Sequence, residues 1–352
     1  HEHIVENVEV MVKVEKELLN IYKKDKIKVG IVDLLEKGGR ETFITNFYKA
    51  LKKEGYNVKL LNLRKVSIKE LNKFDILHFS SCAQRGIWKI FFIKKKVKKI
   101  LTVHGWVKEE AINSLSHKNI LGKIKVLAVL VLWKIIPHLF DIITCPTKDT
   151  ARKNKLKNAI IISNAIFPVD YEKISPKDVR KDKKEILFIT YSSIGGLKNK
   201  TVDRVIEIVR QLNACSQQRI RLLIFGTGFY KKCIPEFVDY FGYRKDFLNV
   251  LKSSDLFITT KMFPDLGYAE MEAGILGIPI AKLSSKTGDE EIVAGRTGIL
   301  ARNEREMIKL LKKYIANLEC QKKYLGENLK RYIKENKNWE IIIKKWNTLL
   351  LC

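Results

Sequence analysis

Residues 264–280, PDLGYAEMEAGILGIPI, bring a glutamate close to several glycines. Gly267 precedes a short helical pattern that carries Glu272, and Gly277 and Pro279 follow it. The first turn of a helix offers unpaired backbone N–H groups and the positive end of the helix dipole, both of which suit a diphosphate. A glutamate further along the same helix can accept hydrogen bonds from ribose hydroxyls. This spacing is typical of a nucleotide-sugar site, although the strand-to-helix turn of any α/β domain gives a similar pattern.

The elements that must position these residues alternate regularly along the chain. Apolar runs typical of β-strands alternate with helical stretches, and these runs occupy residues 27–32, 75–80, 99–104, 141–145, 159–164, 185–190, 220–226, 255–260 and 278–283. Such alternation predicts an α/β protein with two doubly wound, Rossmann-like domains built on parallel sheets. Ligands of these sheets bind at the carboxyl ends of the strands, so we expect the site in a cleft between the two domains.

The same residues 264–280 resemble the donor-binding signature of family 4 retaining glycosyltransferases, which have the GT-B fold. The signature usually runs E-G-F-G-x-P-x-x-E-A-x-A-x-G-x-P. Glu272, Gly277 and Pro279 match it, and Gly267 takes the place of its second glycine. The resemblance implies an enzyme that binds a nucleotide-diphosphate sugar, with Glu272 as the acceptor for ribose hydroxyls. The alternative for Glu272 is a carboxylate on a helix surface.

Two charged residues of this family are replaced here. Pro264 occupies the position of the first glutamate of the signature, which contacts the transferred sugar in the family, and Asp265 is the nearby carboxylate that could substitute. The family also binds the phosphates with an arginine and, five residues later, a lysine. Lys200 takes the lysine position and Gly195 the arginine position, so we expect Lys198 and backbone N–H groups at Gly195 to compensate. Taken alone, Lys200 is also typical of a solvated lysine at a helix start.

The resemblance continues in the order of the family over roughly residues 27–345. It includes a glycine loop with Gly38 and Gly39, the strand end LTVHGW with His104, and the segment GDEEIVAGRTGIL with Glu291. Glycines in such a loop let the backbone approach a ligand without a Cβ in the way. The resemblance implies that His104 contacts the transferred sugar, whereas a lone histidine at a strand end is more often structural. The segment NWEIIIKKW resembles the final helix of the family, which crosses back to the first domain.

These matches define the predicted site. Enzymes of this fold neutralise the leaving phosphate with basic side chains and helix N-termini, and no two aspartates here have the D-x-D spacing of the metal-dependent type. We therefore expect no metal ion and no cofactor besides the donor substrate. The predicted catalytic residues are His104, Lys200 and Asp265. The predicted nucleotide-sugar-binding residues are Gly38, Gly39, Gly195, Lys198, Gly267, Tyr268 and Glu272.

The charge of the chain indicates an anionic partner. It has 67 Lys and Arg against 39 Asp and Glu, a net charge of +28, and residues 81–160 alone hold 17 basic against 4 acidic residues. The basic segment Lys94–Lys99 accompanies the apolar run Val126–Trp133, which is too short to cross a bilayer, since crossing requires about 20 apolar residues. We expect this stretch to lie on an anionic membrane surface. The alternatives are a Lys-rich solvated surface and nucleic-acid binding, for which no known motif is present.

Length and cysteine usage complete these expectations. A chain of 352 residues is too long for one typical core, and six cysteines without paired spacing indicate reduced, mostly buried thiols of a cytosolic protein. The first residues lack the basic start and apolar core of a secretory signal. The expected divisions are an N-terminal amphipathic extension (1–26), an acceptor-side domain (27–168), a linker (169–184), a donor-binding domain (185–334) and a C-terminal crossover helix (335–352).

The sequence thus predicts a cytoplasmic, peripherally membrane-associated, metal-independent retaining glycosyltransferase. It would move a hexose from a nucleotide-diphosphate sugar to a glycan or lipid-linked acceptor. One alternative is a catalytically weakened GT-B protein that serves as a binding or scaffold subunit, because Pro264 and Gly195 replace charged family residues. Another is transfer to DNA or to protein. The net charge of +28 favours DNA, but this alternative ranks last because the chain lacks a known nucleic-acid-binding motif.

Overall fold

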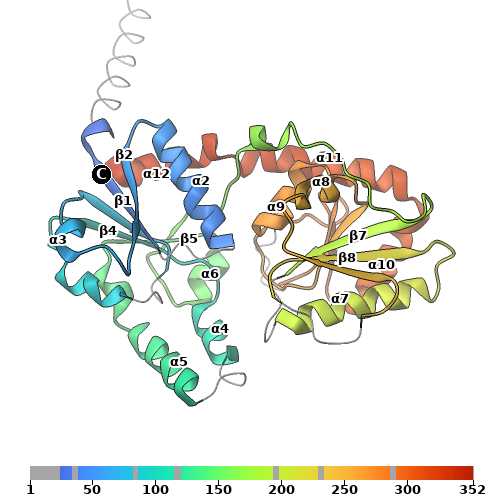
Figure 1. The fold of residues 1–352 in the computed structure, drawn as a ribbon, viewed down its shortest axis with the longest axis horizontal. Helices are drawn as coiled ribbons and strands as arrows, with labels where there is room; N and C mark the ends of the chain where they lie inside the picture. Colours follow the sequence, from blue (N-terminus) through green and yellow to red (C-terminus); the bar gives the residue numbers. More distant parts are fainter. Residues whose placement is uncertain are drawn as a thin grey trace, which may run out of the picture.

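The computed structural model describes residues 24–33, 39–81, 86–114, 120–192, 198–228, 234–285 and 291–351. These residues form two α/β domains that lie side by side and are joined by two chain crossings (Figure 1). Each domain contains one six-stranded sheet, and all strand pairs in both sheets are parallel. The prediction of two doubly wound parallel-sheet domains is therefore confirmed. Residues 1–23 of the predicted N-terminal extension lie outside the described residues.

The first domain has the strand order β2-β1-β3-β4-β5-β6. Consecutive residues of β4, Ile100 and Leu101, belong to different core clusters, so one cluster lies on each face of the sheet. The strands are β1 (Lys28–Asp33), β2 (Asn57–Asn62), β3 (Ile76–Phe79), β4 (Lys98–Thr102), β5 (Ile142–Cys145) and β6 (Ile160–Ile161). The helices are α2 (Gly39–Lys53), α3 (Ile68–Leu71), α4 (Val107–Ser114), α5 (Ile120–Leu132) and α6 (Lys148–Lys153), with 3₁₀ helices η1 (Ile87–Phe92), η3 (Ile136–Leu139) and η4 (Pro168–Tyr171).

The second domain has the strand order β12-β11-β10-β7-β8-β9. Its sheet is also buried on both faces, and the adjacent residues Leu187 and Phe188 of β7 enter opposite core clusters. The strands are β7 (Ile186–Tyr191), β8 (Ile220–Phe225), β9 (Val238–Gly242), β10 (Leu256–Thr259), β11 (Ile280–Leu283) and β12 (Ile299–Ala301). The helices are α7 (Lys198–Asn213), α8 (Phe247–Lys252), α9 (Tyr268–Ile275), α10 (Glu304–Ala316) and α11 (Leu318–Asn336).

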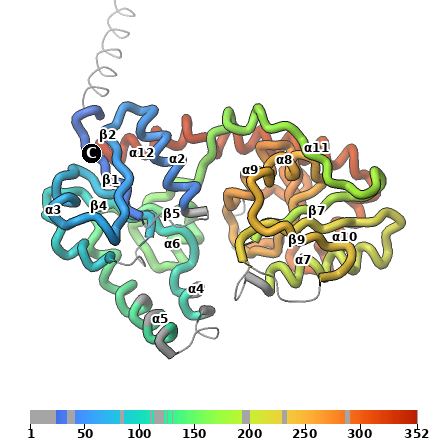
Figure 2. Tube along the Cα trace, in the orientation of Figure 1, coloured from blue at the N-terminus to red at the C-terminus, as the bar shows by residue number. Residues whose placement is uncertain are grey.

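The last helix, α12 (Trp339–Leu351), returns to the first domain (Figures 1 and 2). Its two buried tryptophans pack against Phe47 of α2, with ring centroids 5.7 Å away for Trp339 and 4.5 Å for Trp346. Where the chain crosses between domains, Ile166 N donates to Lys337 O at 2.8 Å and Trp339 N donates to Ile166 O at 3.0 Å. The predicted crossover helix is confirmed, and the two crossings are bonded to each other.

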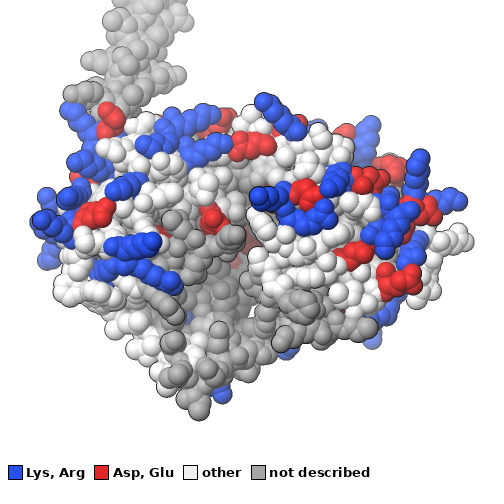
Figure 3. All heavy atoms as spheres, viewed as in Figure 1, with Lys and Arg blue, Asp and Glu red and all other residues white. Residues whose placement is uncertain are grey.

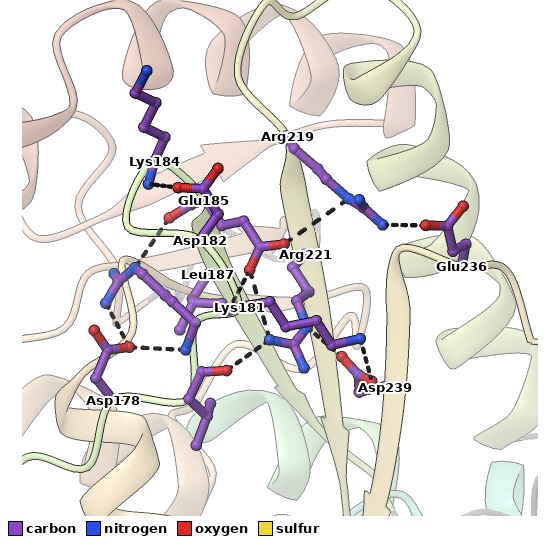
Figure 4. A network of polar contacts seen from close by, with 12 residues as sticks. Asp178, Lys181, Asp182, Lys184, Glu185, Leu187, Arg219, Arg221, Glu236 and Asp239 are labelled. Atoms are coloured by element: carbon purple, nitrogen blue, oxygen red, sulfur yellow. Dashed lines mark hydrogen bonds and ion pairs between the residues drawn. The ribbon is translucent and has the colours of Figure 1, made fainter.

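The segment that follows the first crossing is fixed to the second domain by ion pairs at the amino ends of β7 and β8 (Figure 4). Arg221 lies 3.6 Å from Glu185 and also pairs with Asp239, while Lys181 lies 3.8 Å from Asp239. Because these contacts hold the segment to one domain, a change in domain orientation must be absorbed near the paired crossings. The network lies at the opposite end of the sheet from the carboxyl ends of the strands.

The cysteines differ from the expectation of mostly buried thiols. Of the three free cysteines in the described residues, Cys145 is buried, but Cys215 and Cys320 are exposed. Cys215 follows the end of α7, where its Sγ donates to Gln211 O at 3.0 Å. A terminal carbonyl of the helix therefore gains a hydrogen-bond partner at the surface.

Candidate active site

Both sheets have a point where the strand order reverses, and ligands of doubly wound folds bind there. In the second sheet β7 lies between β8 and β10, so the reversal point lies between the loops that follow β7 and β10. The loop after β10 leads to α9 and contains the sequence-predicted residues Asp265 and Gly267. The start of α7 is tied to the same place, since Thr260 Oγ1 donates to Thr201 O at 2.9 Å. The space-filling view shows a hollow between the two domains (Figure 3).

The backbone of residues 264–267, here called the donor loop, is held by charged side chains from elsewhere. Glu291 accepts from Leu266 N at 2.8 Å through its carboxylate, and its own N–H donates to Pro264 O at 3.0 Å. Lys282, which is almost completely buried in β11, donates to Asp265 O at 2.5 Å. These contacts fix the position of the donor loop without using its own side chains.

Helix α9 begins directly after the donor loop, with Gly267 as the N-cap residue. The Glu270 carboxylate accepts from Gly267 N at 2.7 Å, which satisfies the cap without covering the next amides. The N–H groups of Tyr268 and Ala269 fall in the first helical turn, where intrahelical carbonyl partners are lacking. Together with the helix dipole they form a site suited to a phosphate group.

Glu272 lies one turn into α9 and is partly buried. Tyr171 from η4 donates its hydroxyl to Glu272 Oε1 at a long 3.4 Å. Burial raises the pKa of Glu272 to about 7, although the Tyr171 hydrogen bond acts in the opposite direction. The hydroxyl of Tyr268 is also buried and has no hydrogen-bond partner within the described part of the chain. Because its hydrogen bond from Tyr171 is long, the Glu272 carboxyl group is able to accept stronger hydrogen bonds than this one.

Asp265, within the donor loop, lies among charged side chains. Burial and the nearby Glu291 and Glu270 raise the pKa of its carboxyl group, Lys282 and Lys337 act against the rise, and the resulting pKa is about 6. Lys337 forms a buried ion pair with Glu291, the residue that holds the donor loop. Since the carbonyl of Lys337 is bonded at the domain crossing, this pair links the crossing directly to the site.

The first domain contributes the loop after β4, which carries His104 and Trp106. The His104 ring meets Phe43 of α2 edge-on, with centroids 4.5 Å apart, and its neighbour His78 is neutral because burial lowers the His78 pKa to about 3. Trp106 packs on Phe263, the residue before the donor loop, with centroids 4.6 Å apart. The loop that holds His104 therefore meets the donor loop across the cleft.

The other residues predicted from the sequence lie at helix starts or outside the described residues. Lys200 lies in the first turn of α7 and is exposed, and Lys198 begins that helix, although its side chain lies outside the described residues. Gly39 is the first residue of α2, whereas Gly38 and Gly195 fall outside the described ranges. No group of three or more His, Cys, Asp or Glu that could hold a metal ion occurs among the described residues.

Several contributors were not predicted from the sequence. Tyr171 and Trp106 were not singled out, although Trp106 ends the matched segment LTVHGW, and Glu291 was matched without its role in holding the donor loop. Lys282 gave a signal that could have been used, because a lysine within the apolar strand IPIAKL requires a buried partner. Lys337 gave no such signal, since its neighbours in the chain are polar.

Two doubly wound domains with a last helix that returns to the first domain are the architecture of GT-B glycosyltransferases. Residues 172–339 match the family model Glycosyl transferases group 1. Two curated proteins of Methanocaldococcus jannaschii are similar. Uncharacterized glycosyltransferase MJ1069 is 30% identical over 165 residues, which are 43% of this chain and 42% of the relative. Uncharacterized glycosyltransferase MJ1059 is 24% identical over 313 residues, 74% of each chain.

Solved structures show the same fold at low sequence identity. Anabaena Alr3699/HepE, in complex with UDP and glucose, has a TM-score of 0.70 and 14% identity, covering 92% of this chain and 99% of its own. Sucrose-phosphate synthase from Thermosynechococcus elongatus has a TM-score of 0.73 and 12% identity, with 92% and 98% covered. An alpha-glucosyltransferase in complex with UDP and a 13-mer DNA has a TM-score of 0.63 and 12% identity, with 93% and 99% covered.

Proposed function

We propose that the protein is a family 4 retaining glycosyltransferase that moves a hexose from a nucleotide-diphosphate sugar to an acceptor bound by the first domain. The observation that carries this proposal is the start of α9 at the reversal point of the second sheet, with Glu272 one turn further on. The group 1 match of residues 172–339 supports the transferase class. The UDP and glucose held by Anabaena HepE support a nucleotide sugar as the donor.

On this proposal the donor half of the site binds and neutralises the diphosphate. The amides of Tyr268 and Ala269 bind phosphate oxygens, and Glu272 accepts from the ribose hydroxyls. Negative charge grows on the leaving diphosphate as the bond between the anomeric carbon and the phosphate oxygen breaks. Lys200, assisted by Lys198, opposes that charge, so the reaction requires no metal ion.

The transferred sugar lies between the two domains. Asp265 replaces the missing first glutamate of the signature, and His104 contacts the sugar from the side of the first domain. The acceptor hydroxyl attacks from the face that the diphosphate leaves, and its proton passes to the departing phosphate oxygen. This retaining route requires no side-chain base.

The acceptor is a lipid-linked saccharide or another membrane-associated glycan, and the enzyme acts as a cytoplasmic, peripherally attached protein. The concentration of lysines in the first domain supports an anionic acceptor or surface. A nucleic-acid acceptor is the second candidate, because one protein of the same fold holds UDP and DNA. Within the described residues, no helix is both long and apolar enough to pass through a bilayer.

Titration of the full chain with nucleotide sugars, followed by transfer assays with lipid extract and with duplex DNA, tests the proposal. Glu272→Ala should weaken nucleotide binding by about 1–3 kcal/mol, the usual range for hydrogen bonds to a charged group. Glu327→Ala, at an exposed glutamate of α11, is the matched control. Equal affinity of the Glu272 variant and the control would remove Glu272 from the site. Donor binding without transfer or hydrolysis would favour a scaffold subunit.

A further inference from the structure

Helix α5 presents an apolar stripe to solvent. Ile124, Leu127 and Val131 have helical spacing and are 57%, 53% and 61% exposed. Leu132 and Ile135 extend the same stripe and are also exposed. A surface helix of a globular domain normally turns such a stripe toward the core. Here the opposite side is apolar as well, because half-buried Val126 and Leu130 lie there.

The 3₁₀ helix η1 adds aromatic side chains to this surface. Trp88, Phe91 and Phe92 are 55%, 54% and 60% exposed, whereas Ile87 and Ile90 point inward. Those two isoleucines belong to the same core cluster as Trp133, which follows α5. The two elements therefore lie over one cluster and expose large apolar groups from the same part of the domain. Exposed apolar groups in such number mark an interaction site rather than ordinary surface.

The charges around this surface are almost all positive. Residues 86–140 contain 11 lysines and two glutamates. Lys94, Lys95 and Lys96 follow η1 directly and are exposed, and Lys123 and Lys134 are exposed at the two ends of the stripe. A second copy of this chain would bring the same positive charge against it. An anionic bilayer complements both the lysines and the apolar groups, and tryptophan and lysine are typical of membrane interfaces.

Not all of the predicted basic segment belongs to this surface. Lys98 donates to Leu349 O at 2.7 Å, and Lys99 is buried and lies 3.3 Å from Asp141. These two lysines stabilise the fold, so the expectation that the whole of Lys94–Lys99 faces a membrane is wrong for them. Trp133 is only 4% exposed and is likewise a core residue.

We propose that the exposed apolar side chains of α5 and η1 enter the headgroup region of an anionic bilayer, with Lys94, Lys95 and Lys96 on its phosphates. The occupant of the surface is thus lipid, and attachment is to one leaflet. Helix α4 packs against α5 and lies on the side of the first domain that faces the second (Figure 1). If the proposed function holds, this attachment brings the opening between the domains close to lipid-linked acceptors.

Flotation of the full chain with vesicles of phosphatidylglycerol or phosphatidylcholine tests the surface. The wild type should bind anionic vesicles at low salt, lose most binding as salt rises and keep a salt-resistant remainder. Leu127→Ser with Val131→Ser should reduce that remainder at least tenfold with an unchanged melting temperature. Lys94, Lys95 and Lys96 changed to Gln should remove the salt-dependent part. Tyr324→Ser is the control, because Tyr324 is 51% exposed on α11.

Wild-type binding without a preference for anionic vesicles, or full binding by the folded α5 double variant, would overturn the proposal. A dimer in light scattering that the double variant dissociates would assign the surface to a second copy and overturn it as well. Titration with nucleotide sugars in the absence of vesicles separates this proposal from the proposed function. Vesicle binding without nucleotide binding would refute only the enzyme, and the reverse result would refute only the membrane surface.

Discussion

The carboxyl group of Glu272 is poised between two protonation states. Burial raises its pKa from 4.5 to about 7, so the folded protein holds this proton more tightly than the unfolded chain does. Stability from this group is therefore present at low pH and falls as pH rises from about 4.5 to 7. A ribose that donates to the carboxylate would favour the charged form, so nucleotide binding and stability have opposite pH dependences here.

Glu272→Gln should therefore raise the free energy of unfolding at pH 8 by at most about 3.5 kcal/mol, since one pKa unit corresponds to about 1.4 kcal/mol. At pH 4 the variant and the wild type should be equally stable. Nucleotide affinity of the wild type should rise between pH 6 and 8, and that rise should be absent in the variant. Denaturant titrations and calorimetry at these pH values measure both effects. A pH-independent stability difference would contradict the raised pKa.

Among contacts between single residues, the ion pair between Lys337 and Glu291 is the second on which the site depends. Removing one partner of a buried pair costs about 3–5 kcal/mol, because the remaining charge is left without compensation. Lys337→Met should therefore destabilise the second domain by that amount and weaken nucleotide binding through the donor loop. Adding Glu291→Gln to this variant should restore part of the stability. Lys334→Met, at an exposed lysine of α11, the helix that Lys337 caps, should have little effect, and equal melting temperatures for the two lysine variants would refute a structural role for Lys337.

At the scale of elements, the apolar run Val126–Trp133 is partly exposed and partly buried. Leu127, in α5, is exposed, whereas Trp133, just after α5, lies in the core. Trp133→Ala should destabilise the first domain by about 3–5 kcal/mol, the usual cost of truncating a buried tryptophan. Leu127→Ser, in the exposed stripe, should change stability by no more than about 0.5 kcal/mol. Thermal unfolding of both variants measures the contrast. Similar losses at the two positions would mean that the stripe is packed in solution.

At the scale of the whole molecule, Trp106 and Phe263 join the two domains across the cleft. An aromatic pair contributes about 0.5–1.5 kcal/mol beyond the burial of its area, which is enough to change the ratio of closed to open molecules several-fold. Trp106→Ala should therefore increase the radius of gyration in solution scattering without unfolding either domain. Trp88→Ala, at an exposed tryptophan of the same domain, is the control. An unchanged radius for the Trp106 variant would show that other contacts set the domain orientation.

The sequence by itself determined the two parallel sheets and the position of the donor loop. Both depend on neighbours in the chain: the alternation of apolar strands with helices specifies parallel sheets, and the spacing from Gly267 to Glu272 specifies a helix start with a carboxylate one turn on. The start of α9 and the position of its glutamate one turn on are therefore predictable from the local sequence pattern alone. The same is true of the C-terminal helix, whose tryptophans Trp339 and Trp346 are seven residues apart and fall on one face.

Only the tertiary structure decided which distant residues complete the site and which apolar groups remain outside. The contacts of Tyr171 with Glu272 and of Lys337 with Glu291 join residues 101 and 46 positions apart, and such pairs depend on how the domains pack. The run Val126–Trp133 is apolar throughout, so its composition could not indicate which side meets the core. In the folded chain Trp133, which follows α5, lies in the core, whereas Leu127 lies on the side of α5 that does not contact the rest of the domain.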